Sequence, residues 1–295
     1  MKIVQNRPSP GDWTGALAGV APWLPPHLET LWDNVSPTAA DAIIVPYVFW
    51  PQNAAPHIVP ASMDAFLARL PFWQGAQDRH ILLDASDTAE PYATLGPAAL
   101  FKTSASLRWP GVQPLPFLVP DPGEVMPIDK AAYDVSFVGC LETHPIRPAL
   151  ARWVKTWTGL NTSFHVIDKP FYGGAGERSE AAVQQFREQM HATRFALCPR
   201  GRGMNSRRFF EALAMGRIPV LYSDAAHLPL SSRIDYAAFV VHVPEGMGRW
   251  TPDYLVKFLD THNLADASLQ ARQAYTTWFA PKRFRAFIEA ALAHR

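Results

Sequence analysis

The sequence predicts an α/β protein built from two units, and three observations lead to that prediction. Between residues 133 and 259, short apolar runs alternate with segments of helical periodicity. Up to residue 130 the chain has 7 basic and 12 acidic residues, and beyond it the chain has 20 basic and 14 acidic residues. Proline follows the same division, because 19 of the 28 prolines lie before residue 131. The two parts differ in composition, as separate structural units do.

The overall composition excludes several classes of protein. A chain of 295 residues is long enough for two domains, and 48% hydrophobic with 18% charged residues is typical of a globular protein. The net charge of +1 argues against a protein that coats nucleic acid. No apolar run is long enough to cross a membrane, and the first thirty residues show no secretory signal. Cys140 and Cys198 cannot form a disulfide framework, so we expect a cytoplasmic protein.

Eight short apolar runs, rich in β-branched residues, are predicted to form buried strands. Unbroken apolar runs suit parallel strands that are covered on both faces, whereas a half-exposed strand alternates apolar and polar residues. Three runs lie in the first part, at residues 41–49, 79–84 and 98–102. Five runs lie in the second part, at residues 133–140, 162–167, 194–198, 218–222 and 237–243.

Segments with helical spacing follow the strands of the second part. They lie at residues 146–157, 177–192, 206–215 and 252–259, and the final stretch 265–295 predicts one or two further helices. Strands that alternate with helices in this way predict a doubly wound α/β domain.

The proline-rich segment 115–130 is the predicted connection between the two units, since proline and glycine interrupt regular structure. A surface loop within one domain is the alternative. We therefore expect an N-terminal α/β domain at residues 1–125 and a second α/β domain at residues 131–265. A C-terminal helical segment at residues 266–295 is expected to pack back toward the first domain.

A strand, a glycine-containing loop and a helix follow one another from residue 194 to residue 215. No acidic residue precedes Glu211 in this helix, and four arginines crowd its start: Arg200, Arg202, Arg207 and Arg208. A helix N-terminus already carries about half a positive charge, so cations there are unfavourable unless an anion binds. Backbone N–H groups and guanidinium groups together can form a phosphate or diphosphate receptor. The alternative is a solvated basic loop; a Walker-type loop is excluded because no Gly-Lys-Ser/Thr follows.

The sequence predicts where this helix begins and ends, and it leaves two interpretations for Glu211. Asn205 or Ser206 is expected to cap its N-terminus with a side-chain oxygen, and Gly216 is expected to end it. Glu211 lies one turn after Arg207 and Arg208. Its carboxylate either forms an ion pair within the helix or accepts hydrogen bonds from a ribose diol, and its position leaves both open.

This stretch resembles the exostosin-type glycosyltransferases. The similarity runs over about residues 133–243 and is faint before residue 130. The matching positions are Phe195, Cys198, Pro199 to Arg202, Ser206, Arg208, Phe209, Glu211 to Leu213, Ile218 to Val220, Ser223 and Asp224. Further similarity lies at Leu228 to Leu230 and Ile234 to Tyr236, and upstream at Ser136 to Gly139 and Arg147. Arg207 departs from the pattern, which often has an apolar or aromatic residue there.

The resemblance implies a GT-B fold, in which two Rossmann-like domains face each other across the active-site cleft. It implies inverting transfer of a sugar from a nucleoside diphosphate sugar, with UDP favoured and GDP next, to a saccharide hydroxyl, and no required metal or other cofactor. The second domain then binds the donor and the first the acceptor, although the chain is short for this fold. Peripheral association with the inner membrane surface is a further expectation for a cytosolic relative.

The resemblance also assigns roles to donor-binding residues. Arg208 neutralises the diphosphate, together with Ser206 and the N–H groups of the loop that contains Arg200, Arg202 and Asn205. Glu211 holds the ribose beside Arg207, and Gly139 and Arg147 border the donor site.

Inverting transfer needs a general base for the acceptor hydroxyl, and the acidic first part of the chain is where we expect it. A predicted strand brings Asp84 and then Asp87 to its carboxyl end, where α/β sheets bind ligands. Asp87 is the first candidate and Asp84 the second; as alternatives, each is a turn or N-cap aspartate. The two do not form the Asp-x-Asp motif of metal-dependent sugar transferases, and the ten histidines lack metal-ligand spacing, so no metal is predicted.

Two other classes of function remain open at this point. One is a protein that binds a nucleotide sugar without transferring it, since the general base is uncertain and the acceptor part is short. The other is a transferase or hydrolase that acts on a different diphosphate ester on an α/β fold.

Overall fold

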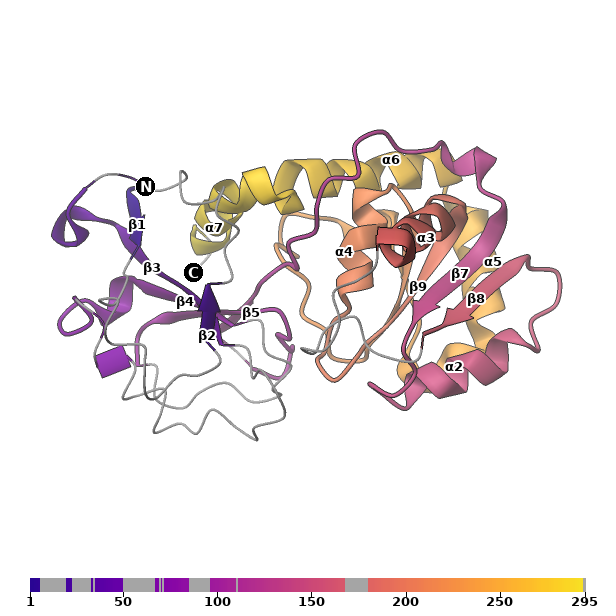
Figure 1. The fold of residues 1–295 in the computed structure, drawn as a ribbon, viewed down its shortest axis with the longest axis horizontal. Coiled ribbons are helices and arrows are strands. Elements are labelled where there is room, and N and C mark those ends of the chain that lie inside the picture. The colour runs from indigo at the N-terminus through magenta and orange to yellow at the C-terminus, as the bar shows by residue number, and fades with distance from the viewer. Residues whose placement is uncertain are drawn as a thin grey trace. The chain divides into compact units, whose positions relative to one another are not determined.

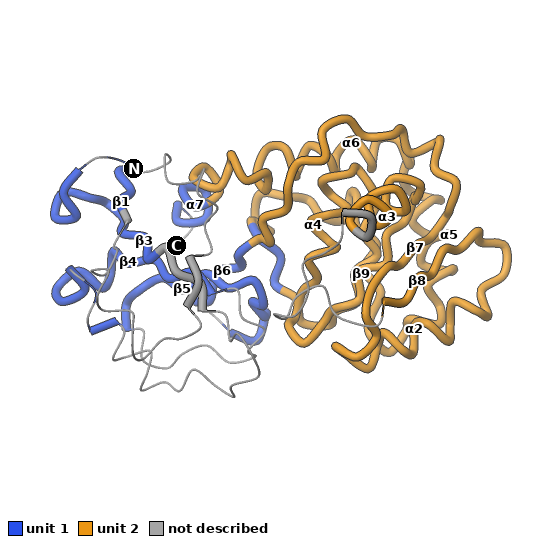
Figure 2. The backbone as a smooth tube through the Cα atoms, viewed as in Figure 1, with its two compact units in different colours: residues 1–115, 227–229, 288–295 blue, residues 116–226, 230–287 orange. Residues whose placement is uncertain are grey.

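A computed structural model describes residues 1–5, 20–22, 33, 35–49, 67–68, 70, 72–84, 96–109, 111–167 and 180–293 (Figure 1). The chain divides into two compact units (Figure 2). Unit 1 comprises residues 1–115, 227–229 and 288–295, and unit 2 comprises residues 116–226 and 230–287. Each unit contains one β-sheet, so the predicted α/β class with two sheet-containing units is confirmed.

Unit 1 has a mostly parallel sheet with the strand order β1-β3-β4-β5-β6. Its strands are β1 (Ile3–Gln5), β2 (Val20–Pro22), β3 (Ala42–Phe49), β4 (His80–Asp84), β5 (Ala99–Lys102) and β6 (Val112–Pro114). Among the described strands of this unit, β2 alone runs antiparallel to its neighbour, which is β3. Strands β3, β4 and β5 were predicted, whereas β1, β2 and β6 have three residues each and are too short to show a hydrophobic period.

Both faces of the central unit 1 strands are buried, because every residue of β4 and β5 is buried and successive side chains point to opposite faces. Val45, Leu82 and Leu100 of three neighbouring strands lie in one buried cluster, which Trp73 joins from a preceding turn. Ile43 lies in a second buried cluster. Because both faces are covered, these strands have continuous apolar runs rather than alternation.

Unit 2 has a fully parallel sheet with the strand order β11-β10-β9-β7-β8. Its strands are β7 (Tyr133–Gly139), β8 (Thr162–Val166), β9 (Thr193–Pro199), β10 (Ile218–Tyr222) and β11 (Val241–His242). The predicted strand at 237–243 is wrong over its first part, because Tyr236–Ala238 forms a 3-10 turn that Asp235 caps through the N–H of Ala237.

The strand order of unit 2 reverses between β7 and β9. From β7 the chain passes first to β8 on one side, and then returns to β9 on the other side. Such a reversal leaves a crevice at the carboxyl ends of the two central strands, and α/β proteins bind ligands there. The loops that follow β7 and β9 therefore lie where a ligand site is expected.

Helices flank the unit 2 sheet and continue to the end of the chain. They are α2 (Ile146–Val154), α3 (Glu180–His191), α4 (Arg207–Ala214), α5 (Thr251–Thr261), α6 (Leu264–Ala274) and α7 (Phe284–Leu292). A π-helical turn at Tyr275–Phe279 and Pro281 separate α6 from α7, since proline does not continue a helix that precedes it. All four predicted internal helices and two C-terminal helices are present.

The proline-rich segment before β7 is bound to unit 2 by side chains. Arg217 is fully buried, and its guanidinium donates to the carbonyls of Met126, Thr193 and Met215. Burial lowers the pKa of Arg217 to about 10, so the group remains charged at neutral pH. The hydroxyl of Tyr275 donates to the carbonyl of Val119 over 2.9 Å. The predicted connection is thus a fixed part of unit 2 from residue 116 onward.

Candidate functional site

Helix α4 begins at the crevice between β7 and β9, and its packing is set by aromatic side chains. Phe209 and Phe210 are fully buried, and Phe210 packs edge-on against Phe279 with ring centroids 5.4 Å apart. The helix ends as predicted: Gly216 has a φ of +62°, and the N–H of Arg217 donates to the carbonyl of Ala212 over 2.9 Å. The N-terminus of α4 is therefore held in place from within unit 2.

The predicted side-chain cap of α4 is wrong. Ser206 occupies the N-cap position with an extended backbone, but its side chain forms no capping hydrogen bond. The side-chain oxygen of Asn205 instead accepts from the N–H of Ser206 over 2.8 Å, and both residues are buried. The first turn contains no acidic residue, as the sequence indicated. The helix start therefore has neither a side-chain cap nor an acid that would offset its partial positive charge.

The structure brings Gly139 and Arg208 together at the end of β7. Arg208 is 8% exposed, and its guanidinium lies over the ring of Phe137, 4.5 Å from the ring centroid. A Cβ atom on Gly139 would lie 2.8 Å from Nη2 of Arg208 and 3.0 Å from the ring of Phe137. Glycine at this position therefore allows the buried cation to cross the carboxyl end of the strand.

Arg147 holds the backbone of the two central loops. Its Nη1 donates to the carbonyl of Cys140 over 2.9 Å, its Nε to that of Arg200 over 3.0 Å, and its Nη2 to that of Pro199 over 3.2 Å. These carbonyls follow β7 and end β9, so one side chain joins the two strands that form the crevice. Arg147 borders the predicted site, and the contacts seen here fix its shape.

The other predicted arginines have different environments. Arg207 forms an ion pair with Glu211 at 3.0 Å along the helix, so the ion-pair interpretation of Glu211 is the one that the structure shows. Arg200 forms an ion pair with Glu245 at 2.8 Å. The side chain of Arg202 is exposed. Two of the four arginine charges are thus balanced by carboxylates within unit 2.

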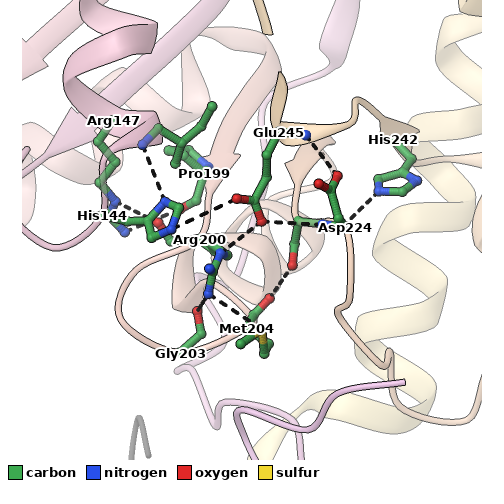
Figure 3. A network of polar contacts seen from close by, with 11 residues as sticks. His144, Arg147, Pro199, Arg200, Gly203, Met204, Asp224, His242 and Glu245 are labelled. Atoms are coloured by element: carbon green, nitrogen blue, oxygen red, sulfur yellow. Dashed lines mark hydrogen bonds and ion pairs between the residues drawn. The ribbon is translucent and has the colours of Figure 1, made fainter. Parts of the chain in front are cut away.

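Sequence reasoning indicated Arg200 but missed the polar residues around it, and we name the four residues His144, Arg200, Asp224 and Glu245 the Glu245 network (Figure 3). Glu245 accepts from the N–H of Asp224 over 3.3 Å, and its own N–H donates to the carboxylate of Asp224 over 2.9 Å. His144 Nε2 lies 3.9 Å from Glu245. Each of the four residues follows a strand, and parallel strands place their carboxyl ends at one edge of the sheet, so this shared position was the signal that could have identified the network.

His144 is neutral in this network at pH 7. Its Nδ1 accepts from the N–H of Ile146 over 3.3 Å, which leaves the ring proton on Nε2, toward Glu245. Partial burial and the positive charges of Arg200 and Arg147 lower the pKa of His144 and outweigh the attraction of Glu245.

Of the two candidate bases in unit 1, the structure describes one. Asp84 ends β4 and pairs in register with Lys102 at the end of β5. Both side chains are fully buried and form an ion pair with each other. Asp87, the first candidate, lies outside the described residues.

Neither a cluster of metal ligands nor a membrane-spanning helix occurs in the described part of the chain. Within it, no group of three or more His, Cys, Asp or Glu side chains is arranged to hold a metal ion. No helix within it has the length and apolar character needed to cross a membrane.

Curated relatives match a short segment of the chain. Exostosin-1b of Danio rerio is 40% identical over 60 residues, which is 20% of this chain and 8% of that protein. Exostosin-1 of Drosophila melanogaster is 46% identical over 59 residues, with the same shares of both chains. The matched segment is therefore a small part of these longer proteins.

Solved structures show only a distant likeness. One is a mutant of S. aureus TarM in complex with Fondaparinux, alpha-GlcNAc-glycerol and UDP, with 10% identity and a TM-score of 0.45 over 90% of this chain and 57% of that one. Another is the GtfA/B complex, with 11% identity and a TM-score of 0.42 over 86% of this chain and 57% of that one. The chain spans less than two thirds of either, and scores this low do not establish a common fold.

The family comparison covers far more of the sequence. Residues 33–247 match the Exostosin GT47 domain, and this range includes most of unit 1 and all five strands of the unit 2 sheet. The chain belongs to the exostosin GT47 family of glycosyltransferases.

Proposed function

We propose that the protein is an inverting glycosyltransferase whose unit 2 binds a nucleoside diphosphate sugar, with UDP as the favoured nucleotide and GDP the next. The observation that carries this proposal is the position of Arg208. Its guanidinium is buried beside Gly139 at the crevice, next to a helix start that has no acid in its first turn. A diphosphate bound here would meet both a cation and the positive end of a helix, and both favour an anion.

The donor site in this proposal uses the loop before α4. Arg208 and the exposed Arg202 supply positive charge to the diphosphate, and Ser206 and the nearby backbone supply hydrogen-bond donors. The same groups stabilise the negative charge that develops on the leaving diphosphate during transfer. Glu211 can accept from the ribose hydroxyls while Arg207 keeps its carboxylate in place.

The acceptor, a saccharide hydroxyl, is proposed to lose its proton to Asp87. Asp84 is the second candidate, but its carboxylate is buried against Lys102, and it would need to leave that ion pair to reach a substrate. We propose that transfer needs neither a metal nor another cofactor.

Ligand-induced stabilisation tests the donor site directly. We expect one nucleoside diphosphate, without divalent metal, to stabilise the wild type by about 2.7 kcal/mol at about 100 times its Kd. Arg208→Gln should lose this stabilisation, because the diphosphate loses its buried cationic partner. Arg194→Gln is the matched control, since Arg194 pairs with Asp134 at the opposite edge of the same sheet. Differential scanning calorimetry measures both variants.

Three other outcomes would change the proposal. Stabilisation of Arg208→Gln as large as that of the wild type would refute the assigned donor site. Binding without any sugar transfer would favour the protein that only binds a nucleotide sugar. Transfer that requires a divalent metal would favour an enzyme that acts on a different diphosphate ester.

A further inference from the structure

One carboxylate joins three loops at the carboxyl edge of the unit 2 sheet. Glu245 follows β11, and its side chain reaches Arg200 in the loop after β9 at 2.8 Å. The same side chain accepts from the N–H of Asp224 in the loop after β10, and Asp224 returns a hydrogen bond from the N–H of Glu245 (Figure 3). Glu245 thus links its own loop to the loop of Asp224 and to the loop of Arg200, which lies 45 residues earlier in the sequence.

Arg200 extends this link into the loop that precedes α4. Its Nη1 donates to the carbonyl of Gly203 over 3.3 Å and contacts the sulfur of Met204 at 3.5 Å. The carbonyl of Met204 accepts from the hydroxyl of Ser223 over 2.7 Å, and the carbonyl of Ser223 accepts from His242 Nε2 over 2.9 Å. Arg200 therefore contacts its own loop on one side and Glu245 on the other.

The negative charge of Glu245 would weaken the binding of an anion nearby unless another interaction offset it. A carboxylate near a diphosphate repels it, and this one is only 22% exposed, so solvent screens it weakly. Its ion pair with Arg200, whose side chain is 17% exposed, compensates for that repulsion and fixes the direction of the guanidinium. Because Arg200 contacts residues of unit 2 itself, we assign its guanidinium to holding the loop in place.

We infer that Glu245 is a positioning residue of the donor site. Through Arg200 it holds the loop of residues 201–205 in the conformation that presents the start of α4 to a nucleoside diphosphate. This inference rests on the proposed function for the identity of the ligand. Arg200 shares the positioning role, whereas Arg208 and Arg202 contact the diphosphate.

The first experiment observes the Arg200–Glu245 pair without a ligand. The NMR signal of the Arg200 Nε–H group, assigned by its disappearance in Arg200→Lys, should be protected from solvent exchange in the wild type. Glu245→Gln keeps the size of the side chain and removes its charge, and we expect it to weaken that protection. Asp134→Asn is the matched control, because Asp134 pairs with Arg194 at 2.6 Å at the other edge of the same sheet.

The second experiment measures the Kd of UDP by calorimetric titration without metal. Loss of the ion pair that positions the loop should weaken UDP binding about tenfold in Glu245→Gln. Arg200→Gln should weaken it to a similar degree, and the double variant should be no weaker than Arg200→Gln alone, since the two residues act as one unit. Asp134→Asn should bind UDP as the wild type does.

Each contrary result has a distinct meaning. Tighter UDP binding in Glu245→Gln would show that the carboxylate only repels the anion, and would overturn the inference. A lower Tm with an unchanged Kd would show a purely structural role and would overturn it as well. If the wild type binds neither UDP nor GDP, the proposed function fails, and the positioning role fails with it. If the wild type and Glu245→Gln bind equally, only the positioning role fails.

Discussion

Gly139 shows how the absence of a side chain shapes the candidate site. The residue ends β7, and the buried guanidinium of Arg208 occupies the space where a Cβ atom would lie. The sequence indicated both residues as site candidates from separate motifs. Their direct contact depends on the pairing of β7 with β9 and on the position of α4, which no local pattern contains.

Gly139→Ala should therefore weaken the proposed nucleotide binding. The new methyl group would lie 2.8 Å from Arg208 and 3.0 Å from Phe137, so the guanidinium must move. Forced rearrangement in a packed region costs about 1–3 kcal/mol, and we expect UDP to bind about tenfold more weakly. Gly246→Ala is the control, because no atom lies within 4 Å of its added Cβ. Equal Kd values for Gly139→Ala and the wild type, from calorimetric titration, would contradict this assignment.

At the scale of elements, close packing rather than charge joins α2 to the turn before α5. Gly248 lies in the 3-10 turn Glu245–Trp250, and the ring of Trp153 on α2 lies directly against it. Nearby, the indole N–H of Trp157 donates to the carbonyl of Arg249 over 3.2 Å. Because Glu245 begins the same turn, this contact also helps to hold the Glu245 network in place.

Gly248→Ala should destabilise this pair of elements. An added Cβ would lie 2.8 Å from Cε3 of Trp153, and a rigid indole ring cannot yield as a flexible side chain can. We expect a loss of about 1–3 kcal/mol in the free energy of unfolding, measured with urea. The matched variant Gly246→Ala, in the same turn, should change the free energy by less than about 1 kcal/mol. A similar stability for both variants would show that the turn moves freely.

Most regular elements near the site could be predicted from the sequence, because their signals are local. The apolar run of β9, the helical spacing of α4 and the glycine that ends it all depend on neighbouring residues. The short strands and the N-cap of α4 could not be predicted in the same way. Three-residue strands form only because a neighbouring strand offers hydrogen-bond partners. The side-chain oxygen of Asn205 accepts from the N–H of the adjacent Ser206 and not from an N–H of the first turn of α4.

At the scale of the whole molecule, histidines in both units make stability depend on pH. Burial is the largest cause that lowers the pKa of each of four described histidines: His80, His144, His191 and His227. As the pH falls, the unfolded chain binds protons before the folded chain does, so the unfolded state gains stability. The stability that is present above the unfolded pKa of about 6.5 is lost below it.

The Tm should therefore fall when the pH is lowered from about 7 to about 5.5, a range above the titration of ordinary carboxylates. For each kcal/mol lost we expect a decrease of roughly 2–4 °C. His191→Gln should make this slope shallower, because it removes one of the four groups from the end of α3. Calorimetry at a series of pH values measures the slope, and a Tm that rises on acidification would contradict the sign.

The sequence by itself determined the α/β class, the succession of most strands and helices along the chain, the end of α4 and the family to which the chain belongs. These features depend on hydrophobic periodicity, on residues with special backbone preferences and on a motif that is continuous in the chain. Only the tertiary structure decided which residues meet: Arg200 with Glu245, Arg208 with Gly139, and Asp84 with Lys102. These contacts depend on strand order, and strand order follows from long-range packing, because each strand pairs with neighbours that lie far away in the sequence.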